Sequence, residues 1–141
     1  MNVGPATTLI SIGAAGASLR VGVRRQATRS PGEPWFDTEI TADAFPFGGT
    51  LETVFTMSDL REWGEGLSGL TAGTGRVVLG GDRAAELIIE ASPQQGAHPD
   101  LVAIRVDVTP SGDDPYPALR YLIFDVPPWW SEIGSRIEAL G

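Results

Sequence analysis

Apolar and polar residues alternate with a period of two in several segments, and this pattern constrains the fold of the chain most. In LVAIRVDVT, residues 101–109, valine or isoleucine recurs at every second position, with Arg105 and Asp107 between them. Such alternation is typical of a strand with one face in a core and the other in water. The eight predicted strands lie within 1–18 and at 18–25, 35–45, 49–56, 76–79, 85–91, 101–109 and 118–126.

Short turns separate most of these segments, which favours antiparallel pairing between strands that are neighbours in the sequence. The Gly48-Gly49 pair is predicted to form the tight turn before 49–56, because glycine accepts a positive φ. Residues 80–83, GGDR, predict a second hairpin. The last strand, 118–126, is apolar on both faces, so we expect it to be central in its sheet.

Two helices are predicted, at 57–70 and 128–140. Thr56 and Asp59 have the spacing of a capping box at the start of the first helix. The apolar side chains that follow share one helical face: Leu60, Trp63, Leu67 and Leu70. Three glycines in this helix cost about 1 kcal/mol each relative to alanine, so packing must hold it. Together the elements predict a single α+β domain over 1–141 with antiparallel sheets.

The chain is acidic, with a formal net charge of −8. Four arginines and no acid precede Glu33, whereas six arginines and eighteen acids lie from there to the end. Phosphates repel such a surface, so nucleic acid and anionic membranes are poor partners and a basic protein is a better one. The opening residues lack the basic start of a signal peptide, because Arg20 is the first arginine. With no cysteine present, we expect a cytoplasmic protein.

No catalytic, cofactor or metal site is predicted. His98, the one histidine, lies in a loop before a proline, and no nucleophile elbow accompanies it. A Walker-type phosphate loop requires lysine, and every basic residue here is arginine. No acidic residues have the spacing of a calcium loop. Glu52, Glu86 and Glu90 leave open a hydrolase with dispersed carboxylates, although we expect exposed strand side chains at these positions.

Four residues are candidates for contact with a protein partner. Asp82 lies in the GGDR turn, and Asp113 and Asp114 lie in the acidic, proline-rich loop PSGDDPYP. The tryptophans are expected in the core, but adjacent Trp129 and Trp130 cannot both face the same way. Trp130 is therefore the fourth candidate.

A motif of spaced residues begins in the turn before the strand at 49–56 and continues through that strand and the helix at 57–70. Its residues are Phe45, Gly48, Leu51, Glu52, Thr53, Ser58, Asp59, Leu60, Trp63, Leu67, Leu70 and Gly73. In this order they resemble the WapI-type immunity proteins of polymorphic toxin systems and related small domains of high-GC bacteria. The resemblance implies an α+β antiparallel fold and, for the immunity members, neutralisation of a partner toxin by direct binding. It implies no catalytic residues.

The sequence thus favours a non-enzymatic immunity protein that binds a basic toxin, such as a nuclease, through complementary charge. The alternative is a structural or homo-oligomeric interaction module, assembled through a strand edge or through Trp129 and Trp130. The oligomeric state stays open between these two hypotheses.

Overall fold

The structure, a computed structural model, describes residues 7–27, 34–70, 75–81, 85–93, 102–110, 118–125 and 131–140. Eight strands and two helices form within these residues. They are β1 (Thr7–Ala14), β2 (Ala17–Ala27), β3 (Trp35–Ala44), β4 (Phe47–Thr56), α1 (Met57–Ser68), β5 (Gly75–Gly80), β6 (Glu86–Pro93), β7 (Val102–Thr109), β8 (Leu119–Asp125) and α2 (Ile133–Glu138). The α+β fold class predicted from the sequence is therefore confirmed.

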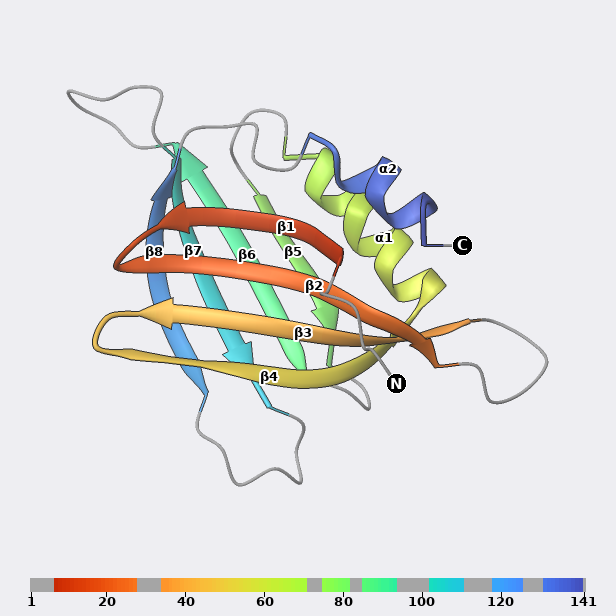
Figure 1. The fold of residues 1–141 in the computed structure, drawn as a ribbon. Helices are drawn as coiled ribbons and strands as arrows, with labels where there is room; N and C mark the ends of the chain where they lie inside the picture. The colour runs from red at the N-terminus through yellow and green to blue at the C-terminus, as the bar shows by residue number, and fades with distance from the viewer. Residues whose placement is uncertain are drawn as a thin grey trace.

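Each half of the chain forms one antiparallel sheet in which every strand pairs with its neighbour in the sequence. The strand orders are β1-β2-β3-β4 and β5-β6-β7-β8. Figure 1 shows the two sheets face to face, with their strands crossing steeply. Helix α1 leads from β4 to β5, and α1 and α2 lie together at one end, beside β5 and β1.

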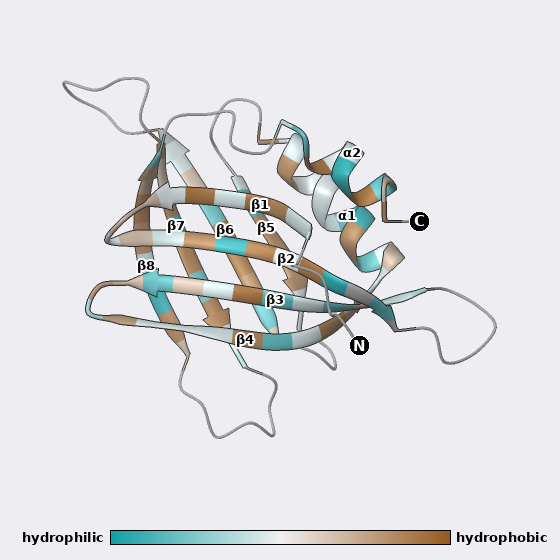
Figure 2. Cartoon of the chain, viewed as in Figure 1, coloured by the Kyte–Doolittle hydropathy of each residue, from teal (hydrophilic) through white to brown (hydrophobic). Residues whose placement is uncertain are grey.

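The alternating sequence pattern corresponds to alternating burial along the strands. In β7, Val102, Ile104, Val106 and Val108 are buried, whereas Arg105 is exposed. Figure 2 shows the same alternation as bands of apolar and polar residues along the strands of both sheets. The inward side chains of both sheets join those of α1 and α2 in one apolar cluster, so burial of apolar surface holds the two sheets together.

Helix α1 begins at the predicted capping box. Thr56 Oγ1 accepts a hydrogen bond from the Asp59 backbone N–H, and the Asp59 carboxylate accepts one from the Thr56 N–H, both at 3.1 Å. The predicted apolar face is buried: Leu60, Trp63, Leu67 and Leu70. The helix ends at Ser68, two residues before its predicted end, where the Gly69 N–H bonds back to the Glu65 carbonyl.

Two glycines allow α1 to approach its neighbours closely. A Cβ on Gly66 would lie 2.8 Å from Val77 Cγ1 of β5, and one on Gly64 would lie 2.7 Å from Ile137 Cδ1 of α2. Both distances are too short for ordinary packing, so alanine would force a shift at either position. These glycines weaken the isolated helix but bring it into contact with both neighbours.

The tight turn between β3 and β4 lies at Phe45-Pro46, so its prediction at Gly48-Gly49 was wrong. Both glycines pair with β3 inside the ladder, and neither has a positive φ. The Phe45-Pro46 peptide bond is cis. Strand β4 therefore starts two residues earlier than predicted, and its glycines belong to the strand.

Strand β8 lies at the edge of its sheet, so the prediction of a central strand was also wrong. Tyr121 and Ile123 face the core, whereas Leu122 and Phe124 point outward and are each 52% exposed. Apolar residues on both faces suggested burial on both faces, but the outward pair lies on an uncovered surface.

Helix α2 is shorter than the predicted helix at 128–140. Glu132 has φ −108° and ψ 7°, which is not α-helical, so the helix starts at Ile133. The buried side chains of Ile133 and Ile137 pack α2 against the core, as their spacing predicts. Residues 126–130, with Trp129 and Trp130, lie outside the described residues.

Two tryptophans of the described chain differ in burial. Trp63 is 1% exposed, as expected for a core residue. Trp35 is 43% exposed, which corrects the prediction that it is buried. The reason is the pleat of β3, in which Phe36 faces the core and its neighbour Trp35 therefore faces outward.

Candidate functional site

An apolar cleft opens between the two sheets beside the first half of β4. Its volume is about 650 Å³. The apolar side chains that line it include Ile40, Ala42, Phe47, Leu51, Val108 and Leu119. They come from β3 and β4 in one sheet and from the ends of β7 and β8 in the other, where β4 crosses those strands in Figure 1.

The cleft exists because β4 is attached to the second sheet over only its second half. There, Thr53 Oγ1 accepts a hydrogen bond from the Ala85 N–H at 3.4 Å. Phe55 is fully buried, and a Cβ on Gly80 would lie 2.8 Å from its ring. The first half differs, since residues 47–50 are all exposed. The two sheets thus meet at the end of β4 and separate at its start.

The first half of β4 also has a free edge. Strand β3 lies on one side of β4, and no strand among the described residues lies on the other. An edge strand directs alternate backbone N–H and C=O groups away from its sheet. Two aromatic side chains lie at this edge, with Phe45 86% and Phe47 69% exposed. Apolar surface and unpaired backbone groups therefore occur together.

A cluster of three charges lies on the outer face of the first sheet, next to the cleft. Glu39 and Glu52 are directly opposite each other in the β3–β4 ladder. Arg24 Nη1 lies 2.9 Å from Glu39 Oε1 and 3.3 Å from Glu52 Oε1. The single guanidinium offsets the repulsion between the carboxylates, but two acids and one base leave a net negative charge. The Glu52 side chain is 71% exposed.

Two hydrogen bonds link β8 of the second sheet to β1 and β2 of the first sheet. The Tyr121 hydroxyl donates a hydrogen bond to the Ser18 carbonyl at 2.8 Å, and the Asp125 carboxylate accepts one from the Gly13 N–H at 2.8 Å. Burial raises the pKa of Tyr121 well above its ordinary value, and the nearby Asp43 carboxylate raises it further. Tyr121 is therefore protonated at neutral pH and acts here as a structural donor.

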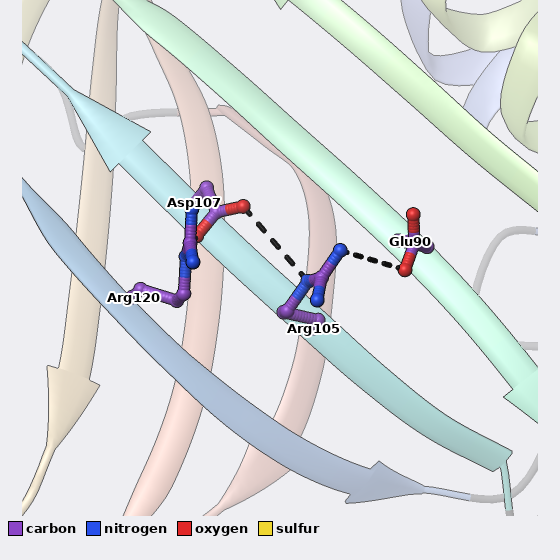
Figure 3. A network of polar contacts seen from close by, with 4 residues as sticks. All are labelled: Glu90, Arg105, Asp107 and Arg120. Carbon is purple, nitrogen blue, oxygen red and sulfur yellow. Dashed lines mark hydrogen bonds and ion pairs between the residues drawn. The ribbon is translucent and has the colours of Figure 1, made fainter.

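Ion pairs cross the outer face of the second sheet (Figure 3). Arg105 Nη2 lies 2.8 Å from Glu90 Oε1, and its Nε lies 4.0 Å from Asp107 Oδ2. Asp107 also pairs with Arg120 on β8. Because each charge has an opposite charge on its own or a neighbouring strand, we interpret the network as a link between β6, β7 and β8.

The structure does not bring together the three carboxylates considered for a hydrolase. Glu52 lies on the outer face of the first sheet, whereas Glu86 and Glu90 lie on the outer face of the second. Glu52 is paired with Arg24 and Glu90 with Arg105. A glycosidase needs two carboxylates within about 10 Å on either side of one bond. Glu52 lies on a different sheet from the other two, and Glu86 and Glu90 are four residues apart on one face of β6.

The four residues predicted to contact a partner lie outside the described residues: Asp82, Asp113, Asp114 and Trp130. Asp113 and Asp114 belong to the segment 111–117, and the residues that flank this segment, Pro110 and Ala118, both line the cleft.

Phe45 and Phe47 are not among the binding residues predicted from the sequence. The predicted strand at 49–56 did not include Phe47. In the structure, Phe47 lies on the inward side of β4, together with Leu51 and Phe55. Its exposure results from the edge position of β4 and from the separation of the sheets. The signal in the sequence that could have identified this binding surface is the pair of phenylalanines on either side of Pro46.

The part of the chain that the structure describes contains no group of three or more histidine, cysteine, aspartate or glutamate residues that could hold a metal ion. His98 lies outside that part. Among the same described residues, neither helix has the length and apolar character needed to cross a membrane.

Comparison with known proteins identifies one family. A family of unknown function (DUF5959) matches residues 7–111, which run from β1 to just beyond the end of β7. The matched part includes β3 and β4, which form one wall of the cleft. No curated protein and no solved structure matches the chain.

Proposed function

The chain belongs to this family of unknown function, DUF5959, and we propose that it is a non-enzymatic protein-binding domain that neutralises a basic toxin, as immunity proteins do. One observation carries the proposal. Phe45 and Phe47 expose their aromatic rings at the free edge of β4, next to an apolar cleft of about 650 Å³. Exposed aromatic side chains beside an apolar groove are typical of protein-binding surfaces.

The charge of the chain supports a basic partner. The formal net charge is −8, and the cluster of Arg24, Glu39 and Glu52 beside the cleft is itself negative. Complementary charge speeds encounter and disfavours acidic competitors. A basic toxin, such as a nuclease acting in the cytoplasm, meets both requirements. The resemblance of about residues 45–91 to WapI-type immunity proteins agrees with this proposal.

Co-expression with the product of the adjacent gene tests the proposal. We expect that gene product to stop growth of the host when it is expressed alone, and co-expression of this chain to restore growth. The two proteins should also co-purify, and the complex should weaken as salt is raised. A toxin that still kills and does not co-purify with this chain would overturn the proposal.

A second candidate function is a homo-oligomeric interaction module. It is favoured by Leu122 and Phe124, which are each 52% exposed on edge strand β8. Light scattering separates the two functions. An immunity protein that binds alone should show the 14.9 kDa of one chain. A larger species that disappears in the Leu122→Thr/Phe124→Thr variant would support the module.

A further inference from the structure

We infer that the edge of β4 from Phe47 to Glu52 binds an extended segment of a basic partner protein as an additional strand. Apolar side chains of that segment enter the cleft, and basic side chains lie against Glu52. This inference rests on the proposed function for the nature of the partner and adds the contact surface and the mode of binding.

Each of the other three sheet edges of the described chain contacts a neighbouring element. Helix α1 packs against β5, and α2 packs against β1, where Arg136 Nη1 donates a hydrogen bond to the Leu9 carbonyl at 3.2 Å. Strand β8 is tied to the β1–β2 hairpin through Tyr121 and Asp125. Along 47–52, no element of the described chain plays such a role.

The space beside that edge has the shape needed for an added strand. Six residues of strand extend over about 20 Å, enough to pair with a segment of similar length. Side chains of an added strand alternate between the two faces of the sheet, so every second one would point into the cleft. Leu51, Val108 and Leu119 provide apolar contacts there.

Gly49 adds to this space. It lies on the inward side of β4, opposite the buried Ala42, and lines the cleft. A Cβ at Gly49 would have nothing within 4 Å, so the absence of a side chain leaves room for one from a partner.

The charge on the outer face favours a basic segment. The remaining side chains of an added strand would lie on the same face as Glu52, which is exposed and shares Arg24 with Glu39. One guanidinium cannot neutralise two carboxylates, so an arginine or lysine from the partner would complete the pairing. The occupant should therefore alternate apolar and basic residues.

The same charges disfavour a second copy of this chain as the occupant. Two copies would each bring a formal charge of −8 and a negative cluster to the contact. Like charges placed opposite each other in a sheet are destabilising. A basic segment of another protein is therefore the better occupant.

The experiment uses the full chain and three synthetic heptapeptides. The first alternates valine and arginine, the second replaces arginine by glutamate, and the third is the valine–arginine peptide with alternate backbone nitrogens methylated. Binding is followed by the NMR shifts of the backbone amides. We expect the first peptide to shift the amides of 47–52 and to protect them from hydrogen exchange. The other two should bind at least about tenfold more weakly, because one repels Glu52 and the other cannot pair with the edge.

A matched pair of variants locates the site. Gly49→Arg fills the cleft and adds a positive charge, and we expect it to bind the valine–arginine peptide at least about tenfold more weakly. Gly134→Arg makes the same change in α2, where a Cβ also has nothing within 4 Å, and it should bind the peptide normally. Thermal unfolding checks that both variants are folded.

Several results would overturn the inference. They are a failure of the first peptide to bind, equal binding of the N-methylated peptide, and shifts concentrated around Leu122 and Phe124. Concentration-dependent shifts of 47–52 without peptide would instead identify a second copy as the occupant. The peptide test needs no toxin, so it separates the two proposals. A Gly49→Arg variant that still neutralised the toxin would contradict the contact surface and leave the immunity function standing.

Discussion

Gly66 of α1 lies so close to Val77 of β5 that a Cβ added to the glycine would be 2.8 Å from Val77 Cγ1. Valine is β-branched and cannot rotate away freely. We therefore expect Gly66→Ala to lower the free energy of unfolding by about 1–3 kcal/mol, the usual range for overpacking, despite its better helix propensity. Urea denaturation measures this change.

Gly134→Ala is the control, since Gly134 lies inside α2 with nothing within 4 Å of its added Cβ. It should raise the free energy of unfolding by about 0.5–1 kcal/mol, as expected for alanine in an open helix position. If both variants gain stability, the close approach of α1 to β5 does not exclude a side chain at position 66.

Removal of the cap of α1 should destabilise the protein. Thr56→Ala loses the acceptor for the Asp59 N–H and leaves a helix N-terminal donor without it. We expect a loss of about 1 kcal/mol in the free energy of unfolding, measured by urea denaturation followed by circular dichroism. Ser68→Ala, an exposed position at the other end of α1, should change little, and equal losses in both variants would contradict the role of the cap.

Stability at high pH should depend on Tyr121. Its pKa is raised in the folded protein, so above pH 10 the unfolded chain loses this proton while the folded chain keeps it. The stabilisation is complete below pH 10 and is lost as pH rises, by up to about 1.4 kcal/mol per pH unit. The chain contains no lysine and no cysteine, so few other side chains titrate there.

Tyr121→Phe tests this expectation in unfolding experiments between pH 7 and pH 11. At pH 7 the variant should lose about 1 kcal/mol, because the hydrogen bond to the Ser18 carbonyl is absent. Above pH 10 its stability should fall less steeply than that of the parent. An unchanged slope would assign the pH dependence to other groups.

Arg24 should contribute to stability because its guanidinium pairs with two carboxylates that face each other. Arg24→Gln removes the cation that pairs with Glu39 and Glu52, and we expect a loss of about 0.5–1 kcal/mol that shrinks as salt is added. The double variant Arg24→Gln/Glu52→Gln should recover most of the loss. No recovery would mean that Arg24 acts through its packing and not through its charge.

Much of the fold could be predicted from the sequence because its signals are local. The period of two in 101–109 and the Thr56–Asp59 spacing depend only on nearby residues, and both correspond to elements of the structure. The wrong predictions concern which other parts of the chain cover a given strand or helix. Leu122 and Phe124 are of residue types that are often buried, and nothing local reveals that no strand of the described residues lies on the far side of β8.

The candidate site could not be predicted for the same reason. Phe47 and Leu51 occupy inward positions of β4 in the structure, but Phe47 lies outside the strand predicted at 49–56, and the position of Leu51 within that strand does not show whether it is covered. Whether an inward side chain is covered depends on the distance between two sheets, which is set by contacts remote in sequence, such as that of Thr53 with Ala85. The acidic composition, in contrast, was visible at once and still determines the kind of partner we propose.

The arrangement of the strands also bears on how the chain folds and how it can be divided. Since each strand pairs with its neighbour in the sequence, closing the ladders requires only short loops, which favours rapid folding of each sheet. A cut between Leu70 and Gly75 would separate two complete sheets. The second fragment would still carry α2, whose Arg136 reaches the Leu9 carbonyl on the first. The protein is therefore suited to fragment complementation, in which two separately expressed halves reassemble into one molecule.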